Sequence, residues 1–249
     1  MRKKLLLSII AGLLFQWGYN QNPVDSSQNE NILLFTKTAG FRHSSIETGV
    51  KLVKMLGEQN GFNVTHTEDA SFFNDSFLKN IDLIVFLSTT GDILNPKQEL
   101  AFKNFIQSKK GFLGIHAATD TEFEWEWYGK LVGGYFSDHP RVQEARLEVL
   151  DKDHPSCKHL PDTWIRKDEW YNFKNLNSDV RVLINLDESS YEGGKNGENH
   201  PIAWSHVYEG SRIFYTGGGH THESYDEPLF VKHILGGILW CLNRENAIE

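Results

Sequence analysis

The stretch Gly111-Phe112-Leu113-Gly114-Ile115-His116-Ala117-Ala118-Thr119-Asp120 decides the fold. Its first half is apolar and has the length of one buried strand, and small residues with a polar side chain follow at once. Such an ending, ahead of a helical pattern, is typical of α/β proteins, which present reactive side chains at the carboxyl edge of a sheet. The core of the stretch has the form of a nucleophile elbow, Gly-x-nucleophile-x-small, with His116 in the nucleophile's place. The alternative is that His116 is a hydrogen-bonded histidine beneath a loop.

Before this stretch, apolar runs alternate with helical patterns. The runs at residues 31–36, 62–66 and 82–88 predict strands. A Ser-x-x-Glu capping box at residues 44–47 and the pair Asn95-Pro96 predict the starts of two helices. Strands that alternate with helices from residue 31 to residue 117 predict an α/β fold with a flavodoxin-like, doubly wound and mostly parallel sheet.

The second half of the chain is less regular. It has a helical pattern at residues 121–131, followed by strand patterns at residues 146–151, 165–173 and 180–186. A hairpin is expected at residues 201–207 and 212–216, because Glu209-Gly210 lies between two apolar runs, and a last helix begins near Asp226. These patterns predict a single domain over residues 31–245, with a β-rich insertion around residues 140–210.

The amino terminus has the features of an export signal. Arg2, Lys3 and Lys4 precede an apolar run, Leu5 to Phe15, that is too short to span a bilayer. Residues 1–20 are therefore predicted to be a signal peptide and residues 21–30 a flexible leader. The mature protein is expected in the periplasm or outside the cell, and not to span a membrane.

Charge and cysteine content exclude several functions. The formal net charge is −8, and removing Arg2, Lys3 and Lys4 would make it −11. A negative balance of this size argues against binding of nucleic acid or anionic membranes. The two cysteines, Cys157 and Cys241, are too few for a cysteine-rich zinc site, and their spacing does not decide whether they pair in an exported protein. The oligomeric state is left open.

Five polar clusters fall at the ends of predicted strands. Because parallel strands deliver their carboxyl ends to one edge of a sheet, these clusters are expected to meet in one site. Any one of them alone has a structural explanation as an ordinary polar loop. The clusters are Arg42-His43, Ser88 to Asp92, His116 to Asp120, Asp168 to Tyr171, and His220 to Glu223.

Three kinds of chemistry fit these residues. Histidines can transfer protons near neutral pH together with a carboxylate such as Glu169. Imidazoles with a carboxylate can also hold zinc or another divalent metal, here assembled from separate loops because no His-x-x-x-His pattern is present. Histidine can act as a covalent nucleophile as well. A dinucleotide site is not expected, because no Gly-x-Gly-x-x-Gly follows the first strand.

Five motifs together resemble the ThuA-like (trehalose utilisation) family over residues 31–243. The resemblance implies a class I glutamine amidotransferase-like fold and a role in sugar metabolism, including that of oxidised (keto) disaccharides. In true amidotransferases a cysteine occupies the elbow. Because His116 stands there instead, this resemblance implies that the protein is not a glutamine amidotransferase, and it puts His220 where the triad histidine would lie. The motifs are Thr38-Ala39-Gly40-Phe41-Arg42-His43, Gly114 to Asp120, Asp168-Glu169-Trp170-Tyr171, His200-Pro201-Ile202-Ala203-Trp204 and Gly217-Gly218-Gly219-His220.

The resulting hypothesis is an exported protein that binds a small carbohydrate and acts on it as a lyase, hydrolase or isomerase. His116, His220 and Glu169 are the expected catalytic residues, and His116 and His220 are also candidate metal ligands. The rival hypotheses are a non-catalytic carbohydrate-binding protein and a partner of a secreted sugar-processing enzyme. The residues expected to bind substrate are Arg42, His43, Thr119, Asp120, His139, Trp170 and His200.

Overall fold

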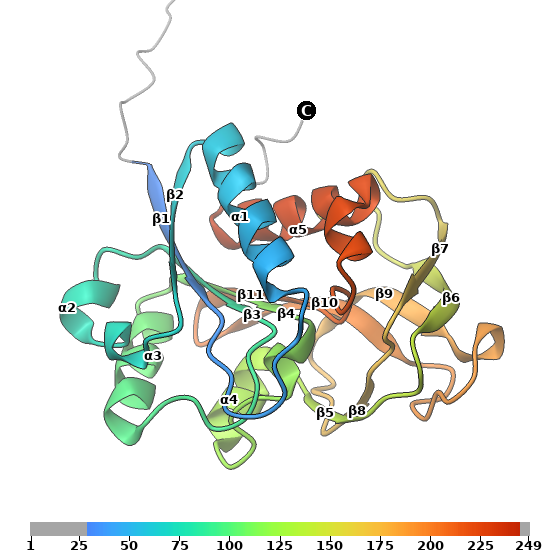
Figure 1. Ribbon diagram of the computed structural model, residues 1–249, viewed down its shortest axis with the longest axis horizontal. Coiled ribbons are helices and arrows are strands. Elements are labelled where there is room, and N and C mark those ends of the chain that lie inside the picture. The colour runs from blue at the N-terminus through green and yellow to red at the C-terminus, as the bar shows by residue number, and fades with distance from the viewer. Residues whose placement is uncertain (1–28, 245–249) are drawn as a thin grey trace, which may run out of the picture.

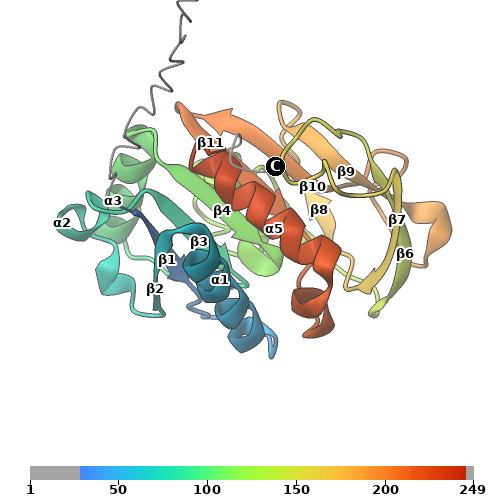
Figure 2. The same ribbon diagram turned by 90° about the horizontal axis from the view of Figure 1, so that it is seen from above.

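A nine-stranded mixed sheet with helices on both faces forms the centre of the protein (Figures 1 and 2). The structure is a computed structural model that describes residues 29–244. The strand order is β2-β1-β3-β4-β11-β10-β9-β6-β7, and β5 and β8 form a separate two-stranded ribbon. The predicted signal peptide and nearly all of the predicted leader lie outside the described residues.

The parallel half of the sheet matches the expectation from the sequence. Its strands are apolar because both faces are covered, and β3 and β4 are buried along their whole length. All four pairings in this half are parallel, so the carboxyl ends of its strands lie at one edge. The strands are β1 (Glu30–Phe35), β2 (Phe62–Thr67), β3 (Leu83–Leu87), β4 (Gly111–Ile115) and β11 (Ser211–Thr216).

The β-rich segment extends the central sheet by antiparallel strands. Burial alternates in β6 and β7, because one side of each of these strands faces solvent, whereas β10 is buried over residues 201–206. β10 pairs with β11, so the predicted hairpin is confirmed. These strands are β6 (Gln143–Val149), β7 (Thr163–Asp168), β9 (Arg181–Asp187) and β10 (Pro201–Tyr208), and the ribbon strands are β5 (Tyr135–Asp138) and β8 (Asn172–Lys174).

α1 and α5 cover one face of the sheet, and α2, α3 and α4 lie on the other (Figures 1 and 2). Within the described part of the chain, no helix is long and apolar enough to cross a membrane. The α-helices are α1 (Ile46–Asn60), α2 (Asp75–Leu78), α3 (Pro96–Gln107), α4 (Glu126–Val132) and α5 (Pro228–Cys241). The 3-10 turns are η1 (Ala70–Phe72), η2 (His116–Thr119), η3 (Glu188–Ser190) and η4 (Glu223–Asp226).

Three local predictions differ from the structure. Ser45, not Ser44, precedes α1, and its side chain makes no capping hydrogen bond, while its hydroxyl donates to the carbonyl oxygen of Gly219. The helix expected at residues 121–131 begins only at Glu126, after η2, a β-bridge at Thr121 and a turn. The strand expected at residues 165–173 is two strands, β7 and β8, which belong to different sheets. In addition, no sequence pattern predicted β5.

Cys157 and Cys241 are free, buried thiols, which answers the question of their pairing for this structure. The Cys241 thiol donates to the carbonyl oxygen of Phe112 in β4. Burial raises the pKa of Cys157 to about 11, so its thiolate form is disfavoured at neutral pH.

We expect Gly236→Ala to destabilise the fold. α5 packs against the 154–158 loop at Gly236, where an added Cβ would lie 2.5 Å from the carbonyl oxygen of Pro155 and 2.5 Å from the Cα of Ser156. Because these atoms belong to the backbone, the helix must shift, and the free energy of unfolding should fall by about 1–3 kcal/mol. Lys232→Ala on the exposed side of α5 is the control and should change it by less than about 0.5 kcal/mol. Urea unfolding measures both, and equal stability of the two variants would contradict the packing argument.

Candidate active site

His116 lies in a strained turn at the end of β4. Its φ of 51° is in the left-handed region, which residues with a side chain rarely adopt. A Cβ added at Gly114 would lie 3.0 Å from the Cβ of Ala118 and 3.1 Å from Cδ2 of Tyr215. The small residues around His116 therefore let the chain turn sharply, as in a nucleophile elbow.

Two hydrogen bonds fix His116 in this position. The hydroxyl of Tyr215 in β11 donates to the carbonyl oxygen of His116 over 2.7 Å. Nδ1 of His116 lies 2.9 Å from the carbonyl oxygen of Gly217, which can only accept, so Nδ1 carries the proton. The lone pair of a neutral His116 is then on Nε2, the atom that faces the neighbouring charged residues.

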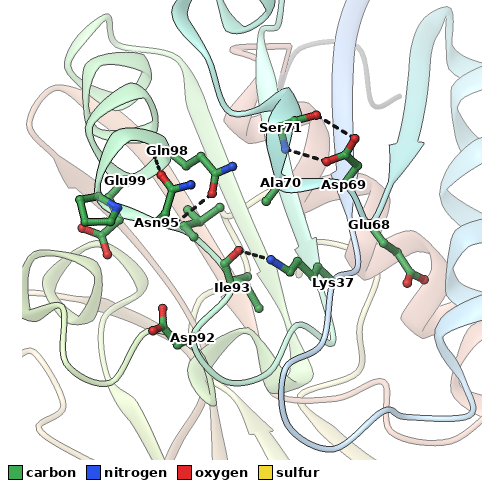
Figure 3. Close-up of a pocket in the computed structure, with 12 residues that line it drawn as sticks. Lys37, Glu68, Asp69, Ala70, Ser71, Asp92, Ile93, Asn95, Gln98 and Glu99 are labelled. Atoms are coloured by element: carbon green, nitrogen blue, oxygen red, sulfur yellow. Dashed lines mark hydrogen bonds between the residues drawn. The ribbon is translucent and has the colours of Figure 1, made fainter.

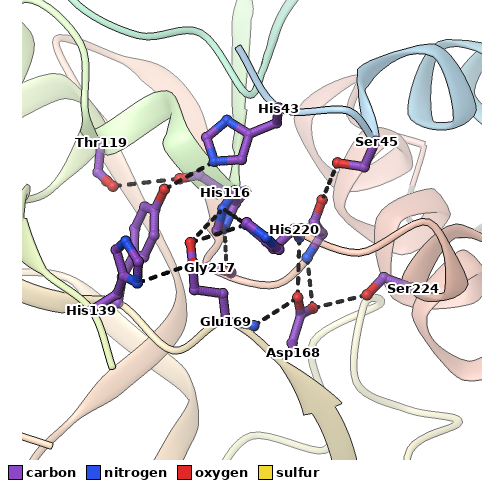
Figure 4. Close-up of polar contacts among 12 residues, drawn as sticks. His43, Ser45, His116, Thr119, His139, Asp168, Glu169, Gly217, His220 and Ser224 are labelled. Atoms are coloured by element: carbon purple, nitrogen blue, oxygen red, sulfur yellow. Dashed lines mark hydrogen bonds and ion pairs between the residues drawn. The ribbon is translucent and has the colours of Figure 1, made fainter. Parts of the chain in front are cut away.

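Glu169 and His220 meet Nε2 of His116 (Figure 4). Oε2 of Glu169 lies 3.5 Å from Nε2 of His116 and 3.0 Å from Nδ1 of His220. The two imidazoles approach to 3.3 Å between Nε2 of His116 and Nδ1 of His220. His139 contacts the other carboxylate oxygen, with Nδ1 3.0 Å from Oε1 of Glu169.

His43 completes the group from the loop before α1. Its ring centroid lies 4.7 Å from that of His116 and 5.2 Å from that of His220. His43 is only 3% exposed, and its Nδ1 has no hydrogen-bond partner in the part of the chain that the structure describes. His43, His116, Glu169 and His220, here called the histidine cluster, each offer one ligand atom, and these four atoms lie within 4.8 Å of one another.

The members of the histidine cluster differ in the charge that they carry at neutral pH. Burial, followed by the neighbouring imidazoles of His116 and His220, lowers the pKa of His43 to about 3, so His43 is neutral at pH 7. Burial alone would raise the pKa of Glu169, but hydrogen bonds donated by His220, and by His116 when its Nε2 is protonated, outweigh it and hold that pKa below its ordinary value. For His220, burial opposes the charged form, but the hydrogen bond to Glu169 raises its pKa on balance. Glu169 is therefore ionised, and His220 is the imidazole that it stabilises as a cation.

Asp168, adjacent to Glu169, anchors the turn that carries His220. Its fully buried carboxylate accepts hydrogen bonds from the backbone N–H groups of Gly219, at 2.8 Å, and His220, at 3.1 Å. The hydroxyl of Ser224 donates to it over 2.9 Å, and Arg166 lies 3.2 Å away as its counter-ion. Asp168 thus ties the end of β7 to the turn after β11.

The structure brings several expected residues to the cluster. The four members of the cluster and His139 lie together, as described above. Thr119 is fully buried next to the elbow, with its hydroxyl 3.1 Å from that of Tyr215. Asp120 follows directly in the chain, and burial raises its pKa to about 6, above that of an ordinary aspartate. His139 and His220 reach solvent, with side chains 42% and 25% exposed, so the cluster is open to a ligand on their side.

Three expected substrate-binding residues have other contacts. Arg42 forms ion pairs with Glu47 and Glu68 at 2.8 and 2.9 Å. Trp170 is fully buried and its indole N–H donates to the carbonyl oxygen of Gln143. His200 is fully buried as well, with Nε2 2.8 Å from the carbonyl oxygen of Tyr171 and Nδ1 2.8 Å from Glu188. The structure does not bring these three side chains to the cluster.

Tyr171 lies in the site but was not among the expected residues. Its ring packs on that of His116 with centroids 4.3 Å apart, and its hydroxyl lies 3.5 Å from Nε2 of His43. A signal for it was present in the sequence. In extended backbone, alternate side chains point to the same side, so a site that uses Glu169 is expected to use Tyr171 and to bury Trp170 on the opposite side.

The donor set of the cluster suits a divalent metal. Three imidazoles and a carboxylate are ligands that zinc accepts in a tetrahedral site. His116 donates its Nδ1 proton to a backbone carbonyl, as metal-binding histidines commonly do, which leaves Nε2 to bind. The same groups can transfer protons without a metal, because an ionised Glu169 contacts two imidazoles.

Comparison with known proteins gives one family. The family model ThuA, described as trehalose utilisation, matches residues 31–241. A solved ThuA-like protein from Bacteroides uniformis has a TM-score of 0.75 and 24% identity over 90% of this chain and 95% of that one. A ThuA-like protein from Parabacteroides merdae has a TM-score of 0.72 and 21% identity over 86% of this chain and 90% of that one.

A more distant structural likeness extends to part of a larger enzyme. The β-galactosidase from Bacillus circulans has a TM-score of 0.57 at 9% identity, over 89% of this chain and 32% of that one. Likeness at such identities establishes the α/β fold, and the chemistry has to be argued from the site. No curated protein matches the chain at a significant level.

We expect Asp168→Asn to weaken the fold by loosening the His220 turn. Asparagine keeps the size of the side chain but removes the charge that binds two backbone N–H groups, Ser224 and Arg166. Hydrogen bonds to a charged group are each worth about 1.5–3 kcal/mol, and a loss on this scale should appear in denaturant unfolding. The control is Asp162→Asn, since the Asp162 side chain is 93% exposed. Equal stability of the two variants would show that Asp168 is not an anchor.

Proposed function

The chain belongs to the ThuA (trehalose utilisation) family, and from this premise we propose that it acts on a sugar or keto-sugar derivative, with a divalent metal such as zinc held by the histidine cluster. The observation that carries the proposal is the convergence of four ligand atoms within 4.8 Å, from residues spread between His43 and His220. Burying polar groups is costly unless they are paired, and the one carboxylate of the cluster contacts His116 and His220 but not His43.

The protonation states support a metal site. Metal ligands must be deprotonated, and the low pKa values of His43 and Glu169 leave both ready to bind at neutral pH. His220, whose pKa is raised by Glu169, would release its proton when a metal binds. The buried Nδ1 of His43 has no hydrogen-bond partner among the described residues, so no protein group fixes the His43 ring through that atom. The two buried cysteines take no part in the cluster, so its chemistry does not need a thiolate.

In the proposed mechanism the protein's own residues hold the sugar and move protons. A bound divalent metal would polarise a sugar oxygen or activate a water molecule. His139 contacts Glu169 and is exposed, so it can pass a proton between the cluster and solvent. Asp120, with its raised pKa of about 6, can exchange a proton near neutral pH beside the elbow. A lyase, hydrolase or isomerase reaction is compatible with these groups.

Two other functions remain as alternatives. Proton transfer without a metal is favoured by the contact of Glu169 with His116 and His220. A non-catalytic carbohydrate-binding protein, or a partner of a secreted sugar-processing enzyme, would use the same open side of the cluster for binding alone.

We also propose a flavodoxin-like, amidotransferase-like classification of the fold, supported by the parallel order β2-β1-β3-β4-β11.

Metal content and turnover test the proposed function together. Purified protein should contain about one divalent metal per chain, and His116→Ala should lose it because a ligand is missing. Turnover of keto-disaccharides or glycosides should fall by about a hundredfold or more in the same variant, the scale on which a lost catalytic group acts. Elemental analysis and a sugar-turnover assay measure the two effects.

His159→Ala is the matched control. Its Nε2 lies 2.9 Å from the carbonyl oxygen of Leu229, outside the cluster, so metal content and turnover should be unchanged. Full turnover in metal-free protein would favour the proton-transfer alternative. Sugar binding that is weakened in His116→Ala, without any turnover in the native protein, would favour the binding protein.

We further propose that the protein is exported, on the basis of the basic residues ahead of the apolar run at residues 5–15. The mature amino terminus should then lie between about residues 18 and 24. Amino-terminal sequencing of the protein from its native host measures this position. Full-length protein retained in the cytoplasm would contradict export.

A further inference from the structure

A cavity of about 710 Å³ beside α3 is lined in part by polar side chains that bond to neighbouring groups of the protein (Figure 3). The ammonium group of Lys37 donates to the carbonyl oxygen of Ile93, and the carboxylate of Asp69 accepts hydrogen bonds from Ser71. Asn95 caps α3. These contacts explain the positions of the side chains without a ligand. A buried imidazole on the opposite face of the sheet, in α5, is different.

His233 of α5 is only 1% exposed, and it bonds to the loop at residues 154–160, here called the 154–160 loop. Its Nδ1 lies 2.9 Å from the carbonyl oxygen of Ser156, which can only accept, so Nδ1 carries the proton. Nε2 then has the lone pair, and within residues 29–244 it has no hydrogen-bond partner. A second N–H at Nε2 would therefore be buried without an acceptor, which is costly. The rings around His233, with centroids 5.3 to 6.1 Å away, are those of Trp164, Phe214 and Phe230.

The charged groups around His233 also oppose a second proton on its ring. His159 and His154 of the loop and Arg166 of β7 each act against a positive charge there. The carboxylate of Glu227, at the start of α5, is bound to Arg166 at 3.0 Å. Burial is the largest cause, and the hydrogen bond to the loop offsets it only in part, so that the pKa of His233 is lowered to about 3. His233 is therefore neutral while the loop is in place.

Two further contacts hold the 154–160 loop on α5, beside which it lies in Figure 1. Nε2 of His159 lies 2.9 Å from the carbonyl oxygen of Leu229, near the start of α5, and burial lowers the pKa of His159. Gly236, on the next turn of the helix after His233, packs directly against the backbone of the loop. Two of the contacts across this interface are thus made by histidines whose charged form is disfavoured while the loop is closed.

We propose that the 154–160 loop is an acid-sensitive latch on α5, closed while His233 is neutral and released when His233 takes up a proton. Above about pH 7.5, His233 is neutral whether the loop is closed or open, so its ring does not shift the balance. Below the ordinary histidine pKa of about 6.5, the opened imidazole binds a proton that the closed one excludes, and each further pH unit favours opening about tenfold. His159 acts in the same direction, because its pKa is also lowered. The latch does not depend on the histidine cluster or on the proposed function.

Thiol labelling at two pH values tests the latch, because each side of the interface carries a buried free cysteine. Cys157 lies in the 154–160 loop, and Cys241 lies at the end of α5. The purified protein is treated with 4,4′-dithiodipyridine at about pH 7.5 and about pH 5, and the labelled peptides are quantified by mass spectrometry. Each rate is divided by that of the same cysteine in urea-unfolded protein at the same pH, which removes the pH dependence of the thiol itself. The corrected rate of Cys157 should rise about thirtyfold at the lower pH, and that of Cys241 should change by less than about twofold.

Two variants remove the titration of His233 in different ways. His233→Asn keeps an N–H group for the carbonyl oxygen of Ser156, and His233→Phe keeps a ring among the aromatic side chains. Because neither side chain takes up a proton, the rise in the Cys157 rate should drop to about threefold or less, the part left to His159. The matched control is His206→Gln. His206 is also buried with a lowered pKa, but its Nε2 bonds to the carbonyl oxygen of Leu131, away from the loop, so this variant should keep the native rise.

Three outcomes would overturn the proposal. The first is a corrected Cys157 rate in the native protein that is the same at both pH values. The second is an equal rise for Cys157 and Cys241, which would mean that acid unfolds the whole domain and not the loop. The third is a full native rise in both His233 variants, which would assign the acid response to another group.

Discussion

The buried carboxylate of Asp168 is the interaction on which the site depends. It lies at the end of β7, in the antiparallel half of the sheet, and binds the backbone of the Gly219–His220 turn that follows β11. Arg166 and Ser224 also bind it, and the guanidinium of Arg166 compensates its charge. This link sets Glu169, the next residue, against His116 and His220. The two halves of the sheet also meet where β10 pairs with β11, but that pairing does not bring Glu169 to the histidines.

Strain and electrostatics act together at the cluster. The left-handed backbone of His116 presents its ring to the other members, and Tyr215 and Gly217 stabilise that conformation. Burial and the neighbouring imidazoles keep His43 neutral, whereas the ionised carboxylate of Glu169 makes His220 the favoured cation. The fold thereby concentrates groups that can bind a metal or move a proton at one edge of the sheet.

Much of the fold follows from local pattern. The buried runs predicted β1, β3 and β4, and Asn95-Pro96 predicted the start of α3, where Asn95 and Gln98 form a capping box. The start of α4 and the split of β7 from β8 were not predicted, because the aromatic residues around both fit a helix, a strand or a core loop equally well. Among the site residues, Tyr171 could be predicted from the alternation of extended backbone, and the ion pair of Arg42 from the acidic residue Glu47 near the start of α1. The partners of Trp170 and His200 could not be predicted from local pattern.

The sequence by itself determined the alternation of strands and helices, and with it the edge at which the polar residues after each parallel strand gather. It also determined the sharp turn at His116, because a larger side chain at Gly114 would clash with Ala118 four residues later. Only the tertiary structure decided which polar side chains meet, since that depends on the order of strands distant in sequence and on the turns between them. Glu169 reaches His116 and His220 because β7 ends beside the turn after β11. The local pattern of apolar and polar residues does not predict that contact.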